Sequence, residues 1–333
     1  MRRQFLALAV LVFASLSPLY DADAEETSSN SRVKVDLGIG TWISFGNTTW
    51  SHNASSVPPL GNPTSKLTYE DHSANVVELT GKVSVGSRLF GRLNIGFAGI
   101  GGGRLTDDDY LTPDGGNPSL RTHSDINNGG LWYVNADAGT RIVNFPNGRG
   151  MLDGFVGFQY WREERKAYGV RQVICTTAGS TIDLGGGRRL CNPADPPISS
   201  STLVITNTTT WYSIRAGLQT EYRVARWLSV QGSAVLKPLS IFENEDTHHL
   251  RRSDFQDPSF TMFGIGIGAD ADVGARVYFS RGLSFNVGYR VFWNRMIDGT
   301  WKNHPTTGGS DSFPLREFQS IRHGVTAGLN FTF

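Results

Sequence analysis

Hydrophobic and polar residues alternate with a period of two over unusually long segments of this 333-residue chain. Such alternation indicates β-strands with one polar and one apolar face. Here the polar face carries charged residues, and the segments exceed the usual length of strands in soluble proteins. The clearest examples are residues 76–86 (VVELTGKVSVG), 211–222 (WYSIRAGLQTEY), 263–279 (FGIGIGADADVGARVYF) and 283–293 (LSFNVGYRVFW).

Short and long connections between these segments follow one another in turn. A soluble sandwich would show the same alternation in shorter strands, whereas a transmembrane barrel needs about 10 residues per crossing, with short turns at one end and long loops at the other. The pattern therefore predicts an all-β, closed antiparallel transmembrane β-barrel of about ten strands with long extracellular loops and both termini on the periplasmic side. The expected strands are 33–46, 66–87, 89–104, 129–144, 151–169, 205–223, 227–242, 259–279, 282–297 and 317–333, and the expected long loops are 46–66, 104–128, 170–205, 243–258 and 298–316.

The first 24 residues have the form of a secretory signal peptide. Two arginines precede an apolar run of about 12 residues and an A-x-A cleavage site at 22–24, which leaves a mature barrel of residues 25–333. Charged residues make up 18% of the chain, and the formal net charge of +1 excludes the strong positive field of a nucleic-acid-binding protein. Cys175 and Cys191 lie close together in a Gly/Pro-rich segment, and an exported chain favours a disulfide between them, which would stabilise by about 3 kcal/mol.

Candidate chemistry gathers in two of the long loops. Residues 106–110 read TDDDY and residues 243–252 read ENEDTHHLRR. Asp107 and Asp109 are two positions apart, so an extended backbone points both carboxylates the same way. If the two loops meet across the barrel mouth, His248 can deprotonate a water molecule while Asp246 orients the imidazole.

Unbroken alternation from the preceding strands would direct all four of these side chains outward. A bulge at residues 101–103 (GGG) and another near Pro238 would reverse the phase and direct them inward. Both bulges are therefore predicted. The other histidines lack the spacing of metal ligands, so no metal site is expected. Arg251 and Arg252 are expected to be solvated, with contact to lipid phosphates or an acidic substrate as the alternative.

The chain resembles the omptins, which are ten-stranded outer-membrane proteases. LTDDDYL at 105–111 is similar to their D-x-D-[WY] motif, NEDTHHL at 244–250 to their D-x-E-H-Y segment, and GFQYWREERKAYG at 157–169 to the strand that follows the first pair. The resemblance implies an aspartic-type endopeptidase in the bacterial outer membrane, in which water attacks a peptide or protein substrate without a covalent intermediate. The catalytic residues that it implies are Asp107, Asp109, Asp246 and His248.

The chain departs from the omptin pattern at two sites. Omptins select basic substrate side chains with a Glu on the first loop and an Asp before the dyad, where this chain has Thr48 and Asn244; Glu243 and Glu245 are alternative substrate contacts. The resemblance also implies lipopolysaccharide as an activator and no other cofactor. Of the lipid-binding Tyr-x-Glu-x-Arg run, Arg162 alone matches.

The last segment, residues 321–333 (IRHGVTAGLNFTF), resembles the C-terminal signal that the barrel-assembly machinery of bacteria recognises. A non-catalytic barrel of structural, adhesive or narrow-pore function is the alternative to a protease. A wide porin is excluded, because inward charges would fill a ten-stranded barrel. The charges expected to pair inside the barrel are Arg215, Glu221, Asp270, Asp272, Arg276 and Arg290.

Overall fold

The computed structural model describes residues 33–111, 116–176 and 198–333. The expected signal peptide and Cys191 lie outside the described residues, so the signal peptide and the disulfide stay predictions. In the part that is described, no helix is long and apolar enough to cross a membrane. The strands are Val33–His52 (β1), Ser65–Val85 (β2), Leu89–Gly101 (β3), Arg104–Asp109 (β4), Leu120–Ile126 (β5), Gly129–Asn144 (β6), Gly150–Cys175 (β7), Ile198–Ala225 (β8), Leu228–His248 (β9), Phe255–Tyr278 (β10), Leu283–Pro305 (β11) and Ser312–Thr332 (β12), with 3-10 turns at Pro146–Gly148 (η1) and His249–Arg251 (η3).

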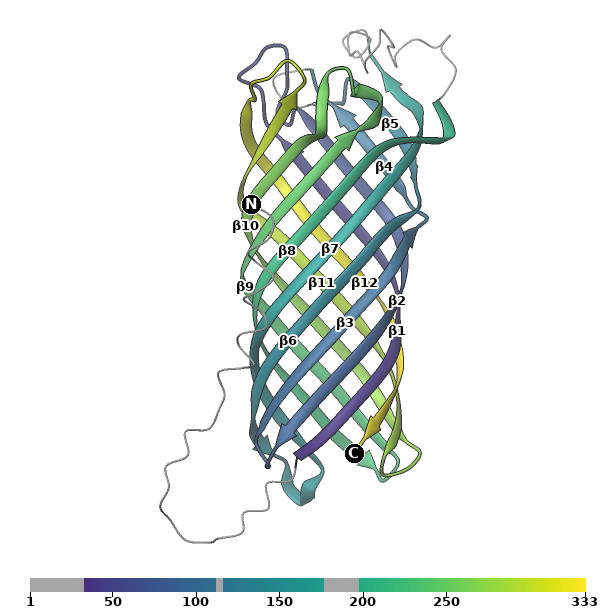
Figure 1. Cartoon of the computed structure of the whole chain (residues 1–333), viewed down its shortest axis with the longest axis vertical. Helices are drawn as coiled ribbons and strands as arrows, with labels where there is room; N and C mark the ends of the chain where they lie inside the picture. The colour runs from purple at the N-terminus through teal and green to yellow at the C-terminus, as the bar shows by residue number, and fades with distance from the viewer. Residues whose placement is uncertain (1–32, 112–115, 177–197) are drawn as a thin grey trace. The chain divides into compact units, whose positions relative to one another are not determined.

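The twelve described strands form one closed antiparallel sheet with ten positions around its circumference (Figure 1). β1 pairs with both β2 and β12, which closes the ring. β3 and β4 follow one another along β2, and β5 and β6 follow one another along β7, so each of these pairs fills one position. The predicted all-β barrel of about ten strands is confirmed.

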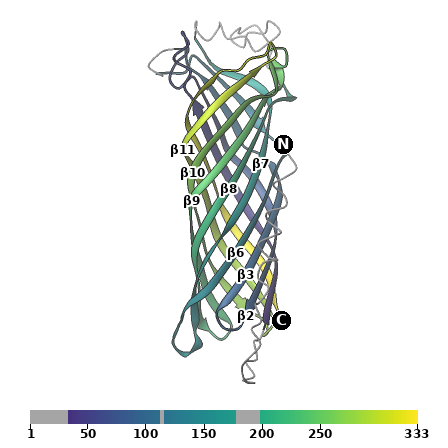
Figure 2. The same ribbon diagram turned by 60° about the vertical axis from the view of Figure 1, so that its left-hand side comes forward.

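The two ends of the barrel differ in their connections, as the alternating connector lengths predict. The end that carries β4 and β5, called the loop end below, holds the longer connections, including 53–64 and 306–311. The opposite end, called the turn end, holds the short ones at 86–88, 145–149, 226–227 and 279–282. The views in Figures 1 and 2 show both ends, and the start of β1 meets the end of β12 at the turn end, where Val35 N donates to Phe333 O.

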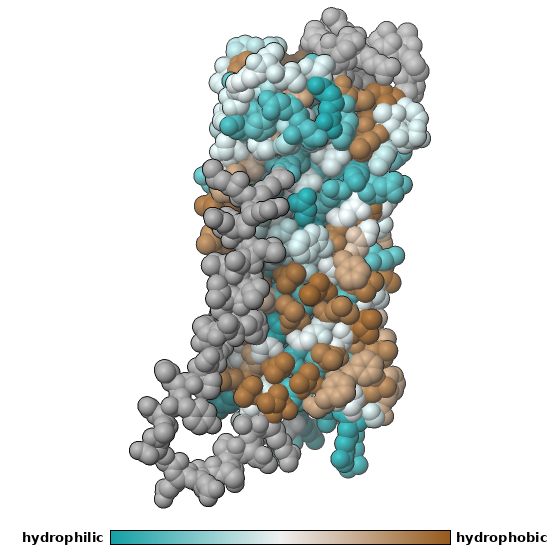
Figure 3. All heavy atoms as spheres, in the orientation of Figure 1, coloured by the Kyte–Doolittle hydropathy of each residue, from teal (hydrophilic) through white to brown (hydrophobic). Residues whose placement is uncertain are grey.

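The outer surface is apolar over the part of the barrel next to the turn end. Alternate residues such as Leu93, Phe97, Val156 and Leu236 are exposed there. In Figure 3 the hydrophobic residues gather on the lower part of the visible face, and hydrophilic residues dominate above them. An exposed apolar band of this kind is what a barrel presents to lipid.

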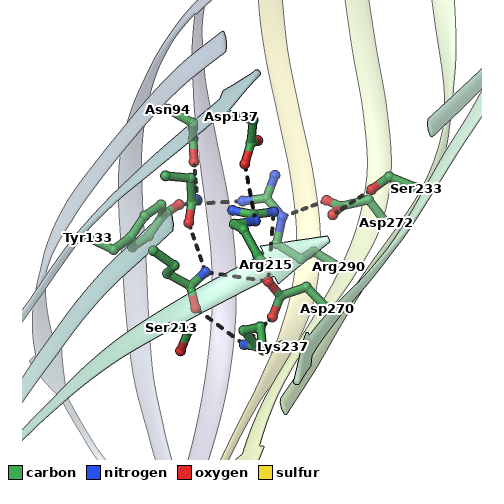
Figure 4. Close-up of polar contacts among 12 residues, drawn as sticks. Asn94, Tyr133, Asp137, Ser213, Arg215, Ser233, Lys237, Asp270, Asp272 and Arg290 are labelled. Atoms are coloured by element: carbon green, nitrogen blue, oxygen red, sulfur yellow. Dashed lines mark hydrogen bonds and ion pairs between the residues drawn. The ribbon is translucent and has the colours of Figure 1, made fainter. Parts of the chain in front are cut away.

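Charged residues fill the interior in pairs. Arg290 Nη1 lies 2.5 Å from Glu78 Oε1. Its Nε lies 2.5 Å from Asp272 Oδ1, and Lys237 Nζ lies 2.6 Å from Asp270 Oδ1 (Figure 4). The pairing predicted for six interior residues is confirmed, because Arg215 also lies 3.9 Å from Asp270 and Arg276 lies 2.9 Å from Glu221.

Aromatic rings cross the interior of the barrel on the loop-end side of these charges. Trp161 of β7 stacks on Phe292 of β11 at 3.9 Å and on Tyr133 of β6 at 4.8 Å, and Trp42 of β1 meets it edge-on. All four also line a cavity of about 1250 Å³ that reaches the turn end. The rings therefore form the inner end of that cavity and separate it from the loop end.

Two interruptions of the strands reverse the inside–outside alternation. Gly102 and Gly103 both have positive φ and separate β3 from β4; Phe97 is exposed before them and Leu105 is buried after them. In β9 the register shifts between Lys237 and Ser240, so that Leu236 is exposed while Phe242 is buried. The bulge predicted near Pro238 is confirmed. At residues 101–103 the predicted reversal occurs without a bulge, because Gly101 pairs with Ser73 and Arg104 with Glu70 with no residue inserted. The two interruptions direct the loop-end residues of β4 and β9 inward.

Candidate active site

The three consecutive aspartates of β4 have two different environments. Asp107 and Asp109 face the interior together with Leu105 and line a cavity at the loop end. Asp108 points to the other face, where Arg121 donates to its two oxygens at 2.6 and 2.8 Å. Asp107 and Asp109 form no ion pair with a lysine or arginine of the described residues, so the strand pairs one carboxylate and leaves its two neighbours unpaired.

Asp246 and His248 form a close pair on β9, two positions apart on the inward face. Asp246 is fully buried, and its Oδ2 lies 3.4 Å from His248 Nε2. The His248 main-chain N–H donates to Ser259 Oγ at 3.0 Å, and its ring packs edge-on against Phe260. The strand and an aromatic ring thus fix the position of the imidazole, and the Asp246 carboxylate lies beside it without a hydrogen bond.

The aspartate pair and His248 meet in one small cavity although their strands are far apart in the sheet. Asp107 and Asp109 of β4 and His248 of β9 all line a space of about 40 Å³ at the loop end. Apolar side chains of β7 and β8, among them Val170 and Val204, form part of its wall. The space is large enough for a water molecule, which needs roughly 10–15 Å³, and its polar groups give such a molecule partners.

The electrostatics of the cavity favour a retained proton on the aspartate pair. Desolvation raises the pKa of Asp109 to about 6, although Ser65, His248 and Arg251 oppose that rise. Desolvation also raises the pKa of Asp107 well above its ordinary value, and the negative charges of Asp109 and Asp246 raise it further. Neighbouring carboxylates in a desolvated site share protons in this way.

Two residues near the site, Ser65 and Tyr69, are absent from the sequence-based prediction, and a third, Arg251, has a different place from the one expected. Ser65 donates to Asp107 Oδ1 at 3.5 Å from the neighbouring strand β2. Tyr69 of β2 is fully buried, and burial together with the charges of Asp246 and Asp107 raises its pKa. Arg251, expected to be solvated, lines the cavity and lies 3.2 Å from Asp254. Ser65 and Tyr69 pair with Asp109 and Leu105 in the neighbouring strand. This pairing could have pointed to them, but only if the register of the two strands had been known.

The three expected substrate contacts on β9 are divided between the two faces. Asn244 faces inward, is buried, and exchanges hydrogen bonds of 3.0 and 3.1 Å with Asn207. Glu243 is exposed, and alternation puts it and Glu245 on the outer face. The suggestion that Glu243 or Glu245 contacts substrate stays a prediction, and both residues lie on the face away from the cavity. Thr48 is also buried and lies 3.1 Å from Ser320 Oγ.

Arg162 lies on the outer wall of β7. Its Nη1 lies 3.4 Å from Thr210 Oγ1 of β8. Tyr160, two residues earlier on the same face, packs against Trp132 and Tyr212 with centroid distances of 4.4 and 5.4 Å. In the described part of the chain, no group of three or more His, Cys, Asp or Glu residues could hold a metal ion.

Comparisons with known proteins place the fold in a class of membrane barrels. The chain is similar to the outer membrane protease OmpT from Escherichia coli, with 15% identity, a TM-score of 0.67, and coverage of 93% of this chain and 99% of that one. A FadL homologue from Pseudomonas aeruginosa and the β domain of the Bordetella autotransporter BrkA align over 90% and 88% of the chain, but with TM-scores of 0.30 and 0.26. No protein-family model and no curated protein sequence matches. The shared fold is therefore that of an outer-membrane β-barrel of the OmpT type.

Proposed function

We propose that this chain is an omptin-like endopeptidase of the bacterial outer membrane that hydrolyses peptide bonds with a directly activated water molecule. The observation that supports the proposal most strongly is that Asp107, Asp109 and His248 line one water-sized cavity at the loop end. Unpaired carboxylates with raised pKa values beside a carboxylate–histidine pair are uncommon outside functional sites. The likeness in fold to OmpT agrees with this function.

In the proposed reaction, His248 is the general base and Asp246 its positioning partner. With Nε2 beside Asp246, Nδ1 takes a proton from the water while the water oxygen attacks the peptide carbonyl carbon. The proton passes from His248 to the departing amine as the C–N bond breaks, giving a carboxylate and an amine. Positioned acid–base catalysis of this kind contributes about 10²–10⁴-fold.

The aspartate pair positions the water and interacts with the developing negative charge. Because the pKa values of both carboxyls are raised, the pair holds a proton at a pH at which ordinary aspartates have lost theirs. That proton can be donated to the oxygen of the former carbonyl group, while the charged carboxylate of the pair orients the water.

Substrate preference in this chain is expected to differ from the basic preference of omptins. At the two positions where omptins carry the acidic residues of that preference, this chain has Thr48 and Asn244. Both are neutral and buried, and both form hydrogen bonds with neighbouring side chains. Arg162 beside Tyr160 and Tyr212 is the proposed contact for lipopolysaccharide. These assignments rest on the resemblance and on the positions of the residues.

The proposal is tested by refolding the barrel of residues 25–333 with and without lipopolysaccharide and offering a mixed peptide library. Wild-type protein cleaves, whereas Asp107→Asn and His248→Asn variants that still fold do not. Asp108→Asn and His249→Asn are matched controls that keep activity, because Asp108 pairs with Arg121 and His249 bonds to Thr206 and Arg252 outside the cavity.

The competing function is a non-catalytic barrel. A wild-type protein that folds but cleaves no peptide under either condition would establish that alternative. A His248→Asn variant that cleaves normally would instead show that the general base is another residue. Ion conductance across a planar bilayer would then distinguish a narrow pore from a structural or adhesive protein.

A further inference from the structure

The large cavity at the turn end has a wall of balanced charges and a mouth of unbalanced ones. Seven carboxylates line it, and each lies within 3.3 Å of a lysine or arginine nitrogen. Seven of the twelve basic residues that line it form ion pairs of 3.4 Å or less with these carboxylates. The wall is therefore close to neutral, and five arginines remain.

The five remaining arginines surround the mouth, and every turn supplies at least one. All five are exposed, and none forms an ion pair with a carboxylate of the described residues. Arg223 alone packs on a ring, with its guanidinium 4.5 Å from the centroid of Tyr278. The mouth ring consists of Arg88 before β3, Arg149 before β7, Arg223 at the end of β8, Arg226 between β8 and β9, and Arg281 between β10 and β11.

The mouth ring lies at the edge of the apolar band. Leu89, Trp227 and Phe279 stand one or two positions from ring arginines and are 60%, 58% and 62% exposed. Large apolar side chains so exposed at the end of a barrel mark the boundary between hydrocarbon and headgroups. An arginine beside them extends its guanidinium to the level of the lipid phosphates.

We propose that the mouth ring binds the phosphate groups of anionic phospholipids in the leaflet next to the turn end. A guanidinium matches a phosphate with two parallel hydrogen bonds, and basic residues near an anionic lipid surface attract it. Because the charges of the cavity wall are paired, the positive charge left without a partner around this cavity belongs to the five arginines of the mouth ring. This inference rests on the proposed membrane location and is independent of hydrolysis.

The experiment measures the association of spin-labelled phosphatidylglycerol and spin-labelled phosphatidylcholine with the barrel refolded into phosphatidylcholine vesicles. Wild type prefers phosphatidylglycerol about fivefold at low salt, and high salt removes most of that preference by screening. A variant with all five ring arginines changed to Gln loses the preference.

A matched variant that lacks five basic residues of the loop end is expected to keep the preference for phosphatidylglycerol. Its substitutions to Gln are at Lys66, Arg104, Arg171, Lys302 and Arg316. Equal preference in wild type and the ring variant, or loss of the preference in the loop-end variant, would overturn the ring assignment.

A soluble source of phosphate is tested in parallel. Tripolyphosphate, added to the barrel in phosphatidylcholine vesicles, is expected neither to bind at micromolar concentration nor to displace the spin-labelled lipid. Tight binding that depends on the five arginines would overturn the lipid assignment in favour of a soluble anion. A wild-type barrel that fails to insert into vesicles would overturn the membrane location itself, which is a different failure from insertion without lipid preference.

Discussion

The carboxylates inside the barrel and those at its loop end have opposite surroundings. Glu78, Asp270 and their neighbours each meet a lysine or arginine in the interior. Asp107 and Asp109 have no such partner among the described residues, and Asp246 has only His248. Asp108, between the unpaired residues, is held by Arg121, so the difference exists even within one strand of six residues.

This difference separates groups that stabilise the barrel from groups that could do chemistry. A buried carboxylate with a close cation keeps its charge and holds two strands together. A desolvated carboxylate without one gains a raised pKa, which costs stability and gives a group that exchanges a proton near neutral pH. The loop end therefore carries the electrostatic strain that the interior avoids.

The largest effect is expected at the dyad. His248→Asn removes the general base, and the rate of peptide hydrolysis is expected to fall about 10³-fold, while the free energy of unfolding changes little. Initial rates measured beside those of His249→Asn test this. A loss of less than tenfold would place the base elsewhere.

Breaking an interior pair is expected to affect stability instead. Lys237→Met removes the cation that lies 2.6 Å from Asp270, and the free energy of unfolding should fall by about 3–5 kcal/mol. Urea titration in vesicles measures it, with Lys302→Met, an exposed lysine, as a control that changes by less than about 0.5 kcal/mol. An unchanged midpoint for Lys237→Met would show that the interior pairs do not stabilise the barrel.

The break between β3 and β4 links the two regions. Gly103 has φ of 87°, and a Cβ there would lie 2.4 Å from the Glu70 carbonyl oxygen, so Gly103→Ala is expected to cost about 1–3 kcal/mol and lower the hydrolysis rate. Gly101→Ala is the matched control, since its Cβ would lie 3.6 Å from the nearest atom. Equal stability and activity of the two variants would mean that the break does not direct Asp107.

The smallest effect is a pH dependence. Because the pKa of Asp109 is raised to about 6 in the folded protein, the folded state binds more protons than the unfolded state from about pH 4 to pH 6. The free energy of unfolding therefore falls as pH rises through that window. Asp109→Asn should flatten the fall and Asp108→Asn should not, and an equally steep fall in Asp109→Asn would contradict the raised pKa.

Most of the fold could be predicted from the chain because period-two alternation and turn spacing are local. In residues 76–86 and 263–279 the alternation itself shows which side chains share a face. The number of such segments predicts the ten strand positions of the barrel. Even the two interruptions were predictable, since Gly101 to Gly103 and Pro238 are residues that a regular strand interior rarely tolerates.

The surroundings of the site could not be predicted in the same way. Whether Glu243 or Asn244 faces inward depends on where the β9 bulge falls, and a shift of one residue exchanges the faces. Ser65 reaches Asp107 through the pairing register of β2 and β4, and Arg251 reaches the cavity through the 3-10 turn after β9. Contacts between side chains distant in sequence need coordinates, whereas the Asp and His motifs themselves do not.

The central claim, that the loop-end carboxylates are unpaired because they serve catalysis, is tested most directly with Asp107→Asn at pH 7. Its free energy of unfolding and its rate of peptide hydrolysis are measured in one refolded preparation. The variant is predicted to be more stable than wild type and inactive, because it removes a destabilised charge that the reaction uses. A variant that is less stable, or that hydrolyses peptides at the wild-type rate, would contradict the claim.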